Sequence, residues 1–151
     1  LGDARLTLEK EPRGTYDLLL IDAFSSDAIP THLLTVEAIR EYLSLLKPDG
    51  VLVLHLSNRN LEITLPAQAA AQALNVPSRH QVYIERADAP DMGEASTEAL
   101  ILSPTEAGLA EFVADRRWNQ LAPTDVRPWT DDYVNLFGSL MRHMGLSRHS
   151  Y

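Results

Sequence analysis

Residues 16–30 read YDLLLIDAFSSDAIP, an apolar run that ends in an aspartate and continues into a polar loop closed by Pro30. The four consecutive aliphatic residues at 18–21 predict a strand covered on both faces, as in parallel sheets, because a half-exposed strand would alternate. Asp22 comes directly after this strand. Because ligands of open parallel sheets bind beyond the carboxyl ends of the strands, we expect Asp22 to lie where chemistry is usually done.

The loop after Asp22 adds further candidates for a ligand site, which are Ser25, Ser26 and Asp27. Two aspartates and two hydroxyls in one tight loop favour the binding of a small polar molecule. The alternative is that both aspartates only stabilise turns, since short polar side chains bond to nearby backbone N–H groups. The residues themselves leave both interpretations open.

A second apolar run, VLVLHL at 51–56, ends near His55 and is followed by the polar residues 57–60. Between the two runs, a 3.6-residue apolar pattern predicts a helix that begins at Thr35 as N-cap and ends before the KPDG turn at 47–50. A strand, helix, strand succession with a right-handed crossover makes the two strands parallel. His55 and Asp22 should therefore lie at the same edge of the sheet.

The remaining pattern predicts a short alternating stretch at 2–8 and two further strands that could form a hairpin. These strands are expected at 78–85 and 96–103, separated by a loop at 86–95. Helices are expected at 66–74, at 105–115 and near 133–141, the last one amphipathic. The alternation of strands and helices indicates an α/β fold for residues 1–151 as a single domain.

Composition excludes several classes of function. Lys and Arg number 13 against 21 Asp and Glu, which gives a net charge of −8 and argues against nucleic acid as a partner. An acidic chain is better suited to a cationic small molecule. The absence of cysteine excludes disulfides and thiolate chemistry. No apolar run is long enough to span a membrane and no signal peptide is recognised, so a soluble, cytoplasmic protein is expected.

Two segments resemble the spermidine and spermine synthase-like family of aminopropyltransferases, most closely its bacterial members. They are YDLLLIDAFSSDAIPTHLL at 16–34 and LLKPDGVLVLHLSNR at 45–59. The resemblance implies a class I S-adenosylmethionine methyltransferase-like (Rossmann-like) fold, with a mostly parallel sheet and a terminal antiparallel strand pair. It implies transfer of an aminopropyl group from decarboxylated S-adenosylmethionine, or a related use of S-adenosylmethionine, to a polyamine.

Roles carried over from this family are implied by the resemblance alone. Asp22 matches the catalytic aspartate that orients and deprotonates the attacking amine, and Asp27, Ser25, Ser26 and His55 match the region that binds the amine substrate. His55 stands where many synthases carry a glutamine. Gly2, Asp3 and Ala4 resemble the segment that binds the adenine of the co-substrate. A homodimer, and a fusion to a membrane segment in a parent chain, are also suggested by the family.

One expected motif is absent, because the seven glycines include no G-x-G turn for the cofactor. The first strands of such a fold are therefore expected to be missing from the N-terminal side, so that the chain is an incomplete domain. Three hypotheses stay open. They are an aminopropyltransferase-like domain, a methyltransferase acting on another substrate, and a non-catalytic remnant of the fold.

Other potential sites are weaker. The spacing of His32, His55 and His80 does not match metal-ligand motifs, so no metal is expected. A hydrolase elbow of the G-x-S-x-G type is absent. The WTDDY segment at 129–133 could line a cation pocket, but capping of the last helix through Thr130 or Asp131 is the favoured interpretation.

Overall fold

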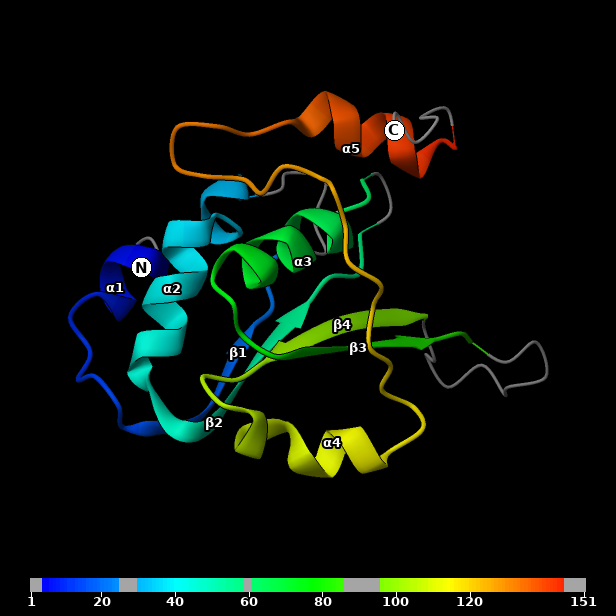
Figure 1. Cartoon of the computed structure of the whole chain (residues 1–151). Coiled ribbons are helices and arrows are strands. Elements are labelled where there is room, and N and C mark those ends of the chain that lie inside the picture. Colours follow the sequence, from blue (N-terminus) through cyan, green and yellow to red (C-terminus); the bar gives the residue numbers. More distant parts are fainter. Residues whose placement is uncertain (1–3, 25–29, 59–60, 86–95, 146–151) are drawn as a thin grey trace.

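The computed structural model describes residues 4–24, 30–58, 61–85 and 96–145. In this part of the chain, helices pack on a four-stranded sheet (Figure 1). The strands are β1 (Tyr16–Ile21), β2 (Leu46–His55), β3 (Ser78–Tyr83) and β4 (Thr97–Leu102). The helices are α1 (Ala4–Leu8), α2 (Val36–Leu45), α3 (Thr64–Ala73), α4 (Ala110–Ala114) and α5 (Leu136–His143), with 3-10 turns η1 (Thr31–Leu33) and η2 (Glu106–Leu109).

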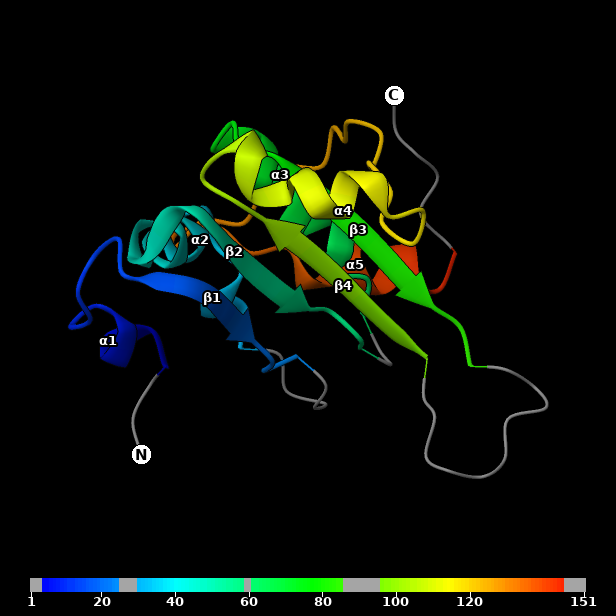
Figure 2. The ribbon, with the colours of Figure 1, turned by 90° about the horizontal axis from the view of Figure 1, so that it is seen from below.

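The sheet has the strand order β1-β2-β4-β3, which Figure 2 shows from below. β1 and β2 are parallel, and α2 forms the crossover between them. β4 runs antiparallel to both of its neighbours, β2 and β3. The predicted α/β class with an antiparallel strand pair at one end is confirmed. Among the described strands, one pair is parallel and two pairs are antiparallel.

Helix α2 begins where the sequence predicts. The Thr35 hydroxyl accepts a hydrogen bond from the Ala38 N–H at 3.2 Å, which satisfies one of the free donors of the first turn. The helix ends at Leu45 and the chain enters β2 at once, so the KPDG segment belongs to the irregular start of this strand. Gly50 is required there, because a Cβ atom would lie 2.8 Å from the backbone oxygen of Tyr16.

One face of the sheet, here named the closed face, carries alternate strand residues that α2 and α3 cover. These residues are Leu19, Ile21, Leu52, Leu54, Leu100 and Leu102. The side chains of Tyr42 and Trp129 are fully buried in the same cluster. Backbone bonding supports this packing, since the Val36 N–H donates to the Trp129 carbonyl at 2.9 Å. The main core of the described chain lies on this face.

The opposite face, here named the open face, carries Leu18, Leu20, Val51, Val53 and Ile101 and is covered only in part. The segment containing η2 and α4 lies below the sheet in Figure 1 and packs a small cluster over β2 and β4. This cluster does not extend to β1, so Leu18 and Leu20 remain 61% and 57% exposed. The prediction that this strand is covered on both faces is wrong for the described chain, because the segment of η2 and α4 packs over β2 and β4 and not over β1.

Three helical segments depart from the sequence predictions. The stretch expected to alternate at 2–8 is helical from Ala4 to Leu8, and the helix expected at 105–115 is a 3-10 turn followed by the short α4. Helix α5 forms, but its apolar residues Leu136, Phe137 and Leu140 face solvent. None of the described helices is both long enough and apolar enough to cross a membrane.

The orientation of α5 has a polar cause. Ser139 on the inner side of the helix is fully buried, and its carbonyl accepts a hydrogen bond from the Glu62 N–H. The Arg142 guanidinium lies 3.3 Å from the Glu62 carboxylate. These polar contacts attach α5 to the segment before α3, which leaves the apolar side of the helix outside.

Candidate functional site

Asp22 and His55 meet at the carboxyl ends of the parallel strands β1 and β2. Ile21 pairs with Leu54 in the register of the two strands, so the next residue on each strand faces its counterpart. His55 Nδ1 lies 2.7 Å from Asp22 Oδ1. The predicted convergence of the two strand ends is confirmed, whereas the catalytic role of Asp22 and the substrate-binding role of His55 stay predictions.

The geometry of this pair defines the hydrogen position on the ring. An ionised carboxylate only accepts hydrogen bonds, so His55 Nδ1 carries the hydrogen and donates it to Asp22. Nε2 of the same ring is buried and has no hydrogen-bond partner among the described residues. The Asp22 side chain is 52% exposed, compared with 28% for His55. The imidazole therefore holds an accessible carboxylate in one orientation.

Asn58 braces the loops that follow the two strands. Its Nδ2 donates to the Phe24 carbonyl at 2.6 Å, and its Oδ1 accepts from the Leu61 N–H at 3.0 Å. Phe24 is fully buried, so the backbone beyond Asp22 is anchored on both sides. Local sequence pattern predicts a polar loop at Asn58 and no specific role for its side chain. The contact between Asn58 and Phe24 joins the loops after two different strands, so local sequence pattern could not predict it.

A second polar cluster supports the same edge of the sheet from β4. Glu98 Oε1 accepts hydrogen bonds from Thr64 Oγ1 and His80 Nε2, each at 2.6 Å. The Glu98 N–H donates to Ser57 Oγ at 2.8 Å. Burial by itself raises the pKa of the Glu98 carboxyl, but the hydrogen bonds from His80 and Thr64 outweigh burial and lower this pKa. Glu98 therefore ties α3, β3 and the loop after His55 together as an anion.

Several predicted site residues lie outside the described residues. They are Gly2 and Asp3 of the segment expected to bind the co-substrate, and Ser25, Ser26 and Asp27 of the loop after β1. Ala4, the third residue of the co-substrate segment, begins α1. In the described part, no three His, Asp or Glu side chains group together as metal ligands would. His55 and His80 are instead each bonded to a carboxylate.

Asp131, the first aspartate of the WTDDY segment, has structural contacts. Asp131 accepts two hydrogen bonds from the Arg5 guanidinium, at 2.7 and 2.8 Å, and one from the Thr35 hydroxyl at 2.8 Å. The Arg5 hydrogen bonds hold the pKa of Asp131 below its ordinary value. Arg127 lies 3.8 Å from the ring centroid of Tyr133, so a protein cation occupies that aromatic face. The prediction that Thr130 or Asp131 caps α5 is wrong. Asn135 is the N-cap, and its Oδ1 accepts a hydrogen bond from the Gly138 N–H.

No protein-family model and no curated protein sequence matches the chain. Solved structures with a similar backbone include the following two proteins. MnmC2 from Aquifex aeolicus has 17% sequence identity and a TM-score of 0.46, over 68% of this chain and 28% of that protein. Spermidine synthase from Thermotoga maritima has 14% identity and a TM-score of 0.47, over 97% of this chain and 49% of that protein. The chain thus spans less than half the length of either protein that it resembles.

Proposed function

We propose that this chain provides the amine-binding side of an aminopropyltransferase-type site. In this reaction an aminopropyl group passes from decarboxylated S-adenosylmethionine to a polyamine acceptor. The observation that carries the proposal is the exposed Asp22 carboxylate, held 2.7 Å from His55 at the carboxyl end of β1. The resemblance of residues 16–34 and 45–59 to the spermidine synthase-like family and the net charge of −8 support the same substrate class.

The chemistry requires a group that binds a cation and then removes its proton. A primary amine has a pKa near 10, so at neutral pH it arrives as an ammonium ion that cannot attack carbon. Asp22 can bind this ammonium through Oδ2, because His55 occupies only Oδ1. The Asp22 carboxylate accepts one proton from the ammonium, which frees the nitrogen lone pair to attack. As the new N–C bond forms, the C–S bond of the sulfonium breaks and methylthioadenosine leaves. His55 keeps the carboxylate oriented during this transfer.

The donor side of the reaction lies beyond the residues that the structure describes. When bound, decarboxylated S-adenosylmethionine supplies a carbon activated by a sulfonium leaving group. Gly2 and Asp3, which resemble the adenine-binding segment, are outside the described residues, and the sequence contains no G-x-G turn. The described residues therefore support the acceptor half of the site.

Isothermal titration calorimetry tests the proposal directly. The chain is titrated with methylthioadenosine and with S-adenosylmethionine, each with and without putrescine. We expect putrescine to bind and Asp22→Asn to weaken its binding by about tenfold or more, which corresponds to the loss of one charge-assisted contact. Asp17→Asn is the matched control, because Asp17 lies at the other end of β1, is 80% exposed and pairs with Lys47.

The outcomes separate the three hypotheses. Putrescine binding that depends on Asp22 and not on Asp17 supports the proposal. Tight binding of S-adenosylmethionine that is indifferent to putrescine would favour a methyltransferase acting on another substrate. Absence of binding by every ligand would contradict an amine site and favour a non-catalytic role for the fold.

A further inference from the structure

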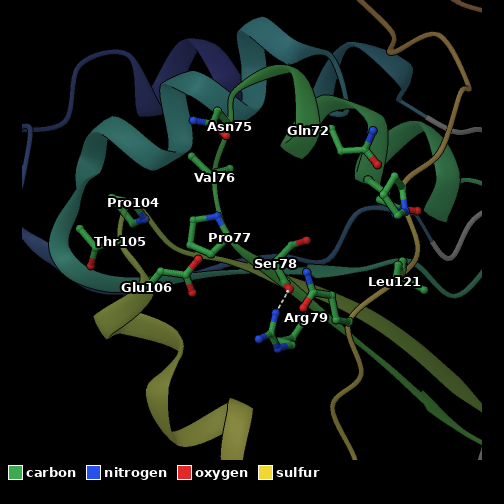
Figure 3. A pocket seen from close by; sticks show the side chains of 13 residues that line it. Gln72, Asn75, Val76, Pro77, Ser78, Arg79, Pro104, Thr105, Glu106 and Leu121 are labelled. Atoms are coloured by element: carbon green, nitrogen blue, oxygen red, sulfur yellow. Dashed lines mark hydrogen bonds between the residues drawn. The ribbon is translucent and has the colours of Figure 1, made fainter.

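A cavity of about 670 Å³ lies at the opposite edge of the sheet from Asp22 and His55 (Figure 3). It is bordered by the C-terminal part of α3, the first residues of β3 and the start of η2. Ser78 at this edge pairs with Leu102, whereas His55 pairs with Ala99 towards the other end of the same strand β4. The cavity shares no residue with the proposed amine site. Its volume is in the range of pockets that bind small molecules.

One of the residues that line the cavity has a buried acceptor that lacks a donor. Gln68 is 4% exposed and lines the cavity, and its Nε2 donates to the Ala122 carbonyl. The acceptor at Ala122 requires an N–H, so the amide oxygen Oε1 must point elsewhere. Gln68 Oε1 is buried and has no hydrogen-bond partner among the described residues. Buried polar atoms normally have a partner, so a ligand N–H would complement this oxygen once the Gln68 side chain turned it toward the cavity.

Gln72, one turn later on α3, provides the contrast. Its Nε2 donates to the Thr124 carbonyl at 3.0 Å, and its Oε1 accepts from the Thr124 N–H at 2.8 Å. Both glutamines therefore bind the segment at 120–124, but only Gln72 is satisfied at both ends. The two glutamines lie on the same helix, so the missing partner of Gln68 Oε1 results from the residues that surround Gln68.

Two opposite charges without ion-pair partners in the described part also line the cavity. Arg79, the second residue of β3, is partly buried and donates one hydrogen bond, to the Ser78 carbonyl at 2.9 Å. Glu106 begins η2 and is exposed. In Figure 3 the two side chains come from different elements, Arg79 from β3 and Glu106 from η2. A guanidinium keeps several free donors in this state, and a carboxylate keeps all of its acceptor sites.

We propose that this cavity binds a small zwitterion of the amino-acid class, either a free α-amino acid or a dipeptide. Arg79 would hold the ligand carboxylate, Glu106 the ammonium group, and Gln68 Oε1 would accept a ligand N–H. Val76, Pro77 and Leu121 supply an apolar wall for the remainder of the ligand. A polyamine is a poor complement, because Arg79 would repel a second cationic group. The cavity is therefore a ligand site separate from the proposed catalytic edge.

Nuclear magnetic resonance of the ¹⁵N-labelled chain tests this site. The chain is titrated with pools of the free L-amino acids and with glycyl dipeptides. We expect one of these ligands to shift the side-chain amide signals of Gln68 and the backbone signals near Glu106. Whether an amino acid or a dipeptide causes the shifts identifies the size of the ligand. Signals near Asp22 should remain unchanged, so the result is independent of the proposed function.

Charge-neutral variants provide the decisive comparison. Arg79→Gln and Glu106→Gln should each weaken the bound ligand by about tenfold or more. Arg116→Gln and Glu111→Gln are matched controls on exposed positions outside the cavity and should leave binding unchanged. The carboxamide of the same ligand should bind weakly and equally to wild type and to Arg79→Gln. No shift with any pool, or binding that is indifferent to both cavity variants, would overturn the proposal.

Discussion

The closed face and the open face of the sheet are made from the same strands, yet helices cover only one of them fully. On the closed face, α2, α3 and Trp129 bury alternate residues of β1, β2 and β4. On the open face, the cluster of Val51, Ile101 and Leu109 covers the centre of the sheet and leaves β1 uncovered. Side chains of one apolar run therefore lie in two environments, one buried under helices and one exposed to solvent.

Strand β1 contains this difference within four residues. Ile21 is 7% exposed and packs in the main core, whereas its neighbour Leu20 is 57% exposed. Both side chains are aliphatic, so hydropathy does not distinguish them. Their alternation along the strand sends them to opposite faces, and only one of these faces meets a helix. The free energy of burial is therefore unequal for residues of the same type.

The largest expected effect is on the closed face. Trp129→Ala removes a fully buried indole from the main core, and a loss of about 3–5 kcal/mol in the free energy of unfolding is expected. Trp118→Ala is the counterpart on the open face. It should cost less than about 2 kcal/mol, because Trp118 is partly exposed and its edge-to-face contact with Phe112 adds about 1 kcal/mol. Urea unfolding measures both, and equal losses would remove the distinction between the faces.

Two adjacent residues of β4 allow the two faces to be compared within one strand. Leu100 and Ile101 are both almost fully buried but point to opposite faces. Leu100→Ala should cost about 3–4 kcal/mol, because it leaves a cavity among residues fixed by two helices. Ile101→Ala should cost nearer to about 2 kcal/mol, since the small cluster of the open face can collapse around it. A larger loss for Ile101→Ala than for Leu100→Ala, measured by urea unfolding, would contradict this interpretation.

The next largest effect is a loss of folding stability in acid, through the carboxylate of Glu98 at the edge of the sheet. The pKa of Glu98 is lowered in the folded chain from its ordinary value of 4.5, so its contribution to stability is present above pH 4.5. The contribution is lost as the pH falls through the folded-state pKa. We expect Glu98→Gln to reduce the dependence of the melting temperature on pH between about 5 and 3. Glu111→Gln, at an exposed position on α4, is the control and should keep the wild-type slope.

The smallest effect is expected at the uncovered edge of the open face. Leu20→Ser should change the free energy of unfolding by no more than about 0.5 kcal/mol, because the side chain is already 57% exposed. Ile21→Ala, one residue later, should cost about 2–4 kcal/mol by the cavity that it leaves. Thermal unfolding of the two variants is the measurement. A strong effect of Leu20→Ser would mean that β1 is covered in solution.

Much of the framework was predictable from local pattern. The four aliphatic residues before Asp22 predicted β1, the helical period with Thr35 as N-cap predicted α2, and the run ending at His55 predicted β2. Their succession also predicted that Asp22 and His55 lie at one edge, where they are 2.7 Å apart. These features depend on short-range periodicity and on the handedness of one crossover, which are properties of neighbouring residues.

Other parts of the site could not be predicted in this way. Glu98 bonds to Thr64 and His80, which are 34 and 18 residues away in the chain. Gln68 and Gln72 have the same chemistry and lie on one helix, but only the structure distinguishes the satisfied amide from the one with a vacant acceptor. Such differences depend on which segment packs opposite each side chain. No local pattern encodes that partner.

Local sequence pattern specified the strand, helix and strand from β1 to β2 and the acidic group after β1, because backbone period and capping depend on neighbouring residues. Tertiary structure alone decided which side of β1 is buried, and it joined Arg5 to Asp131 across 126 residues. It also turned the apolar side of α5 outward by burying Ser139. The physical reason is that burial and ion pairing depend on contacts between distant segments, whose free energy is defined only once the whole chain has packed.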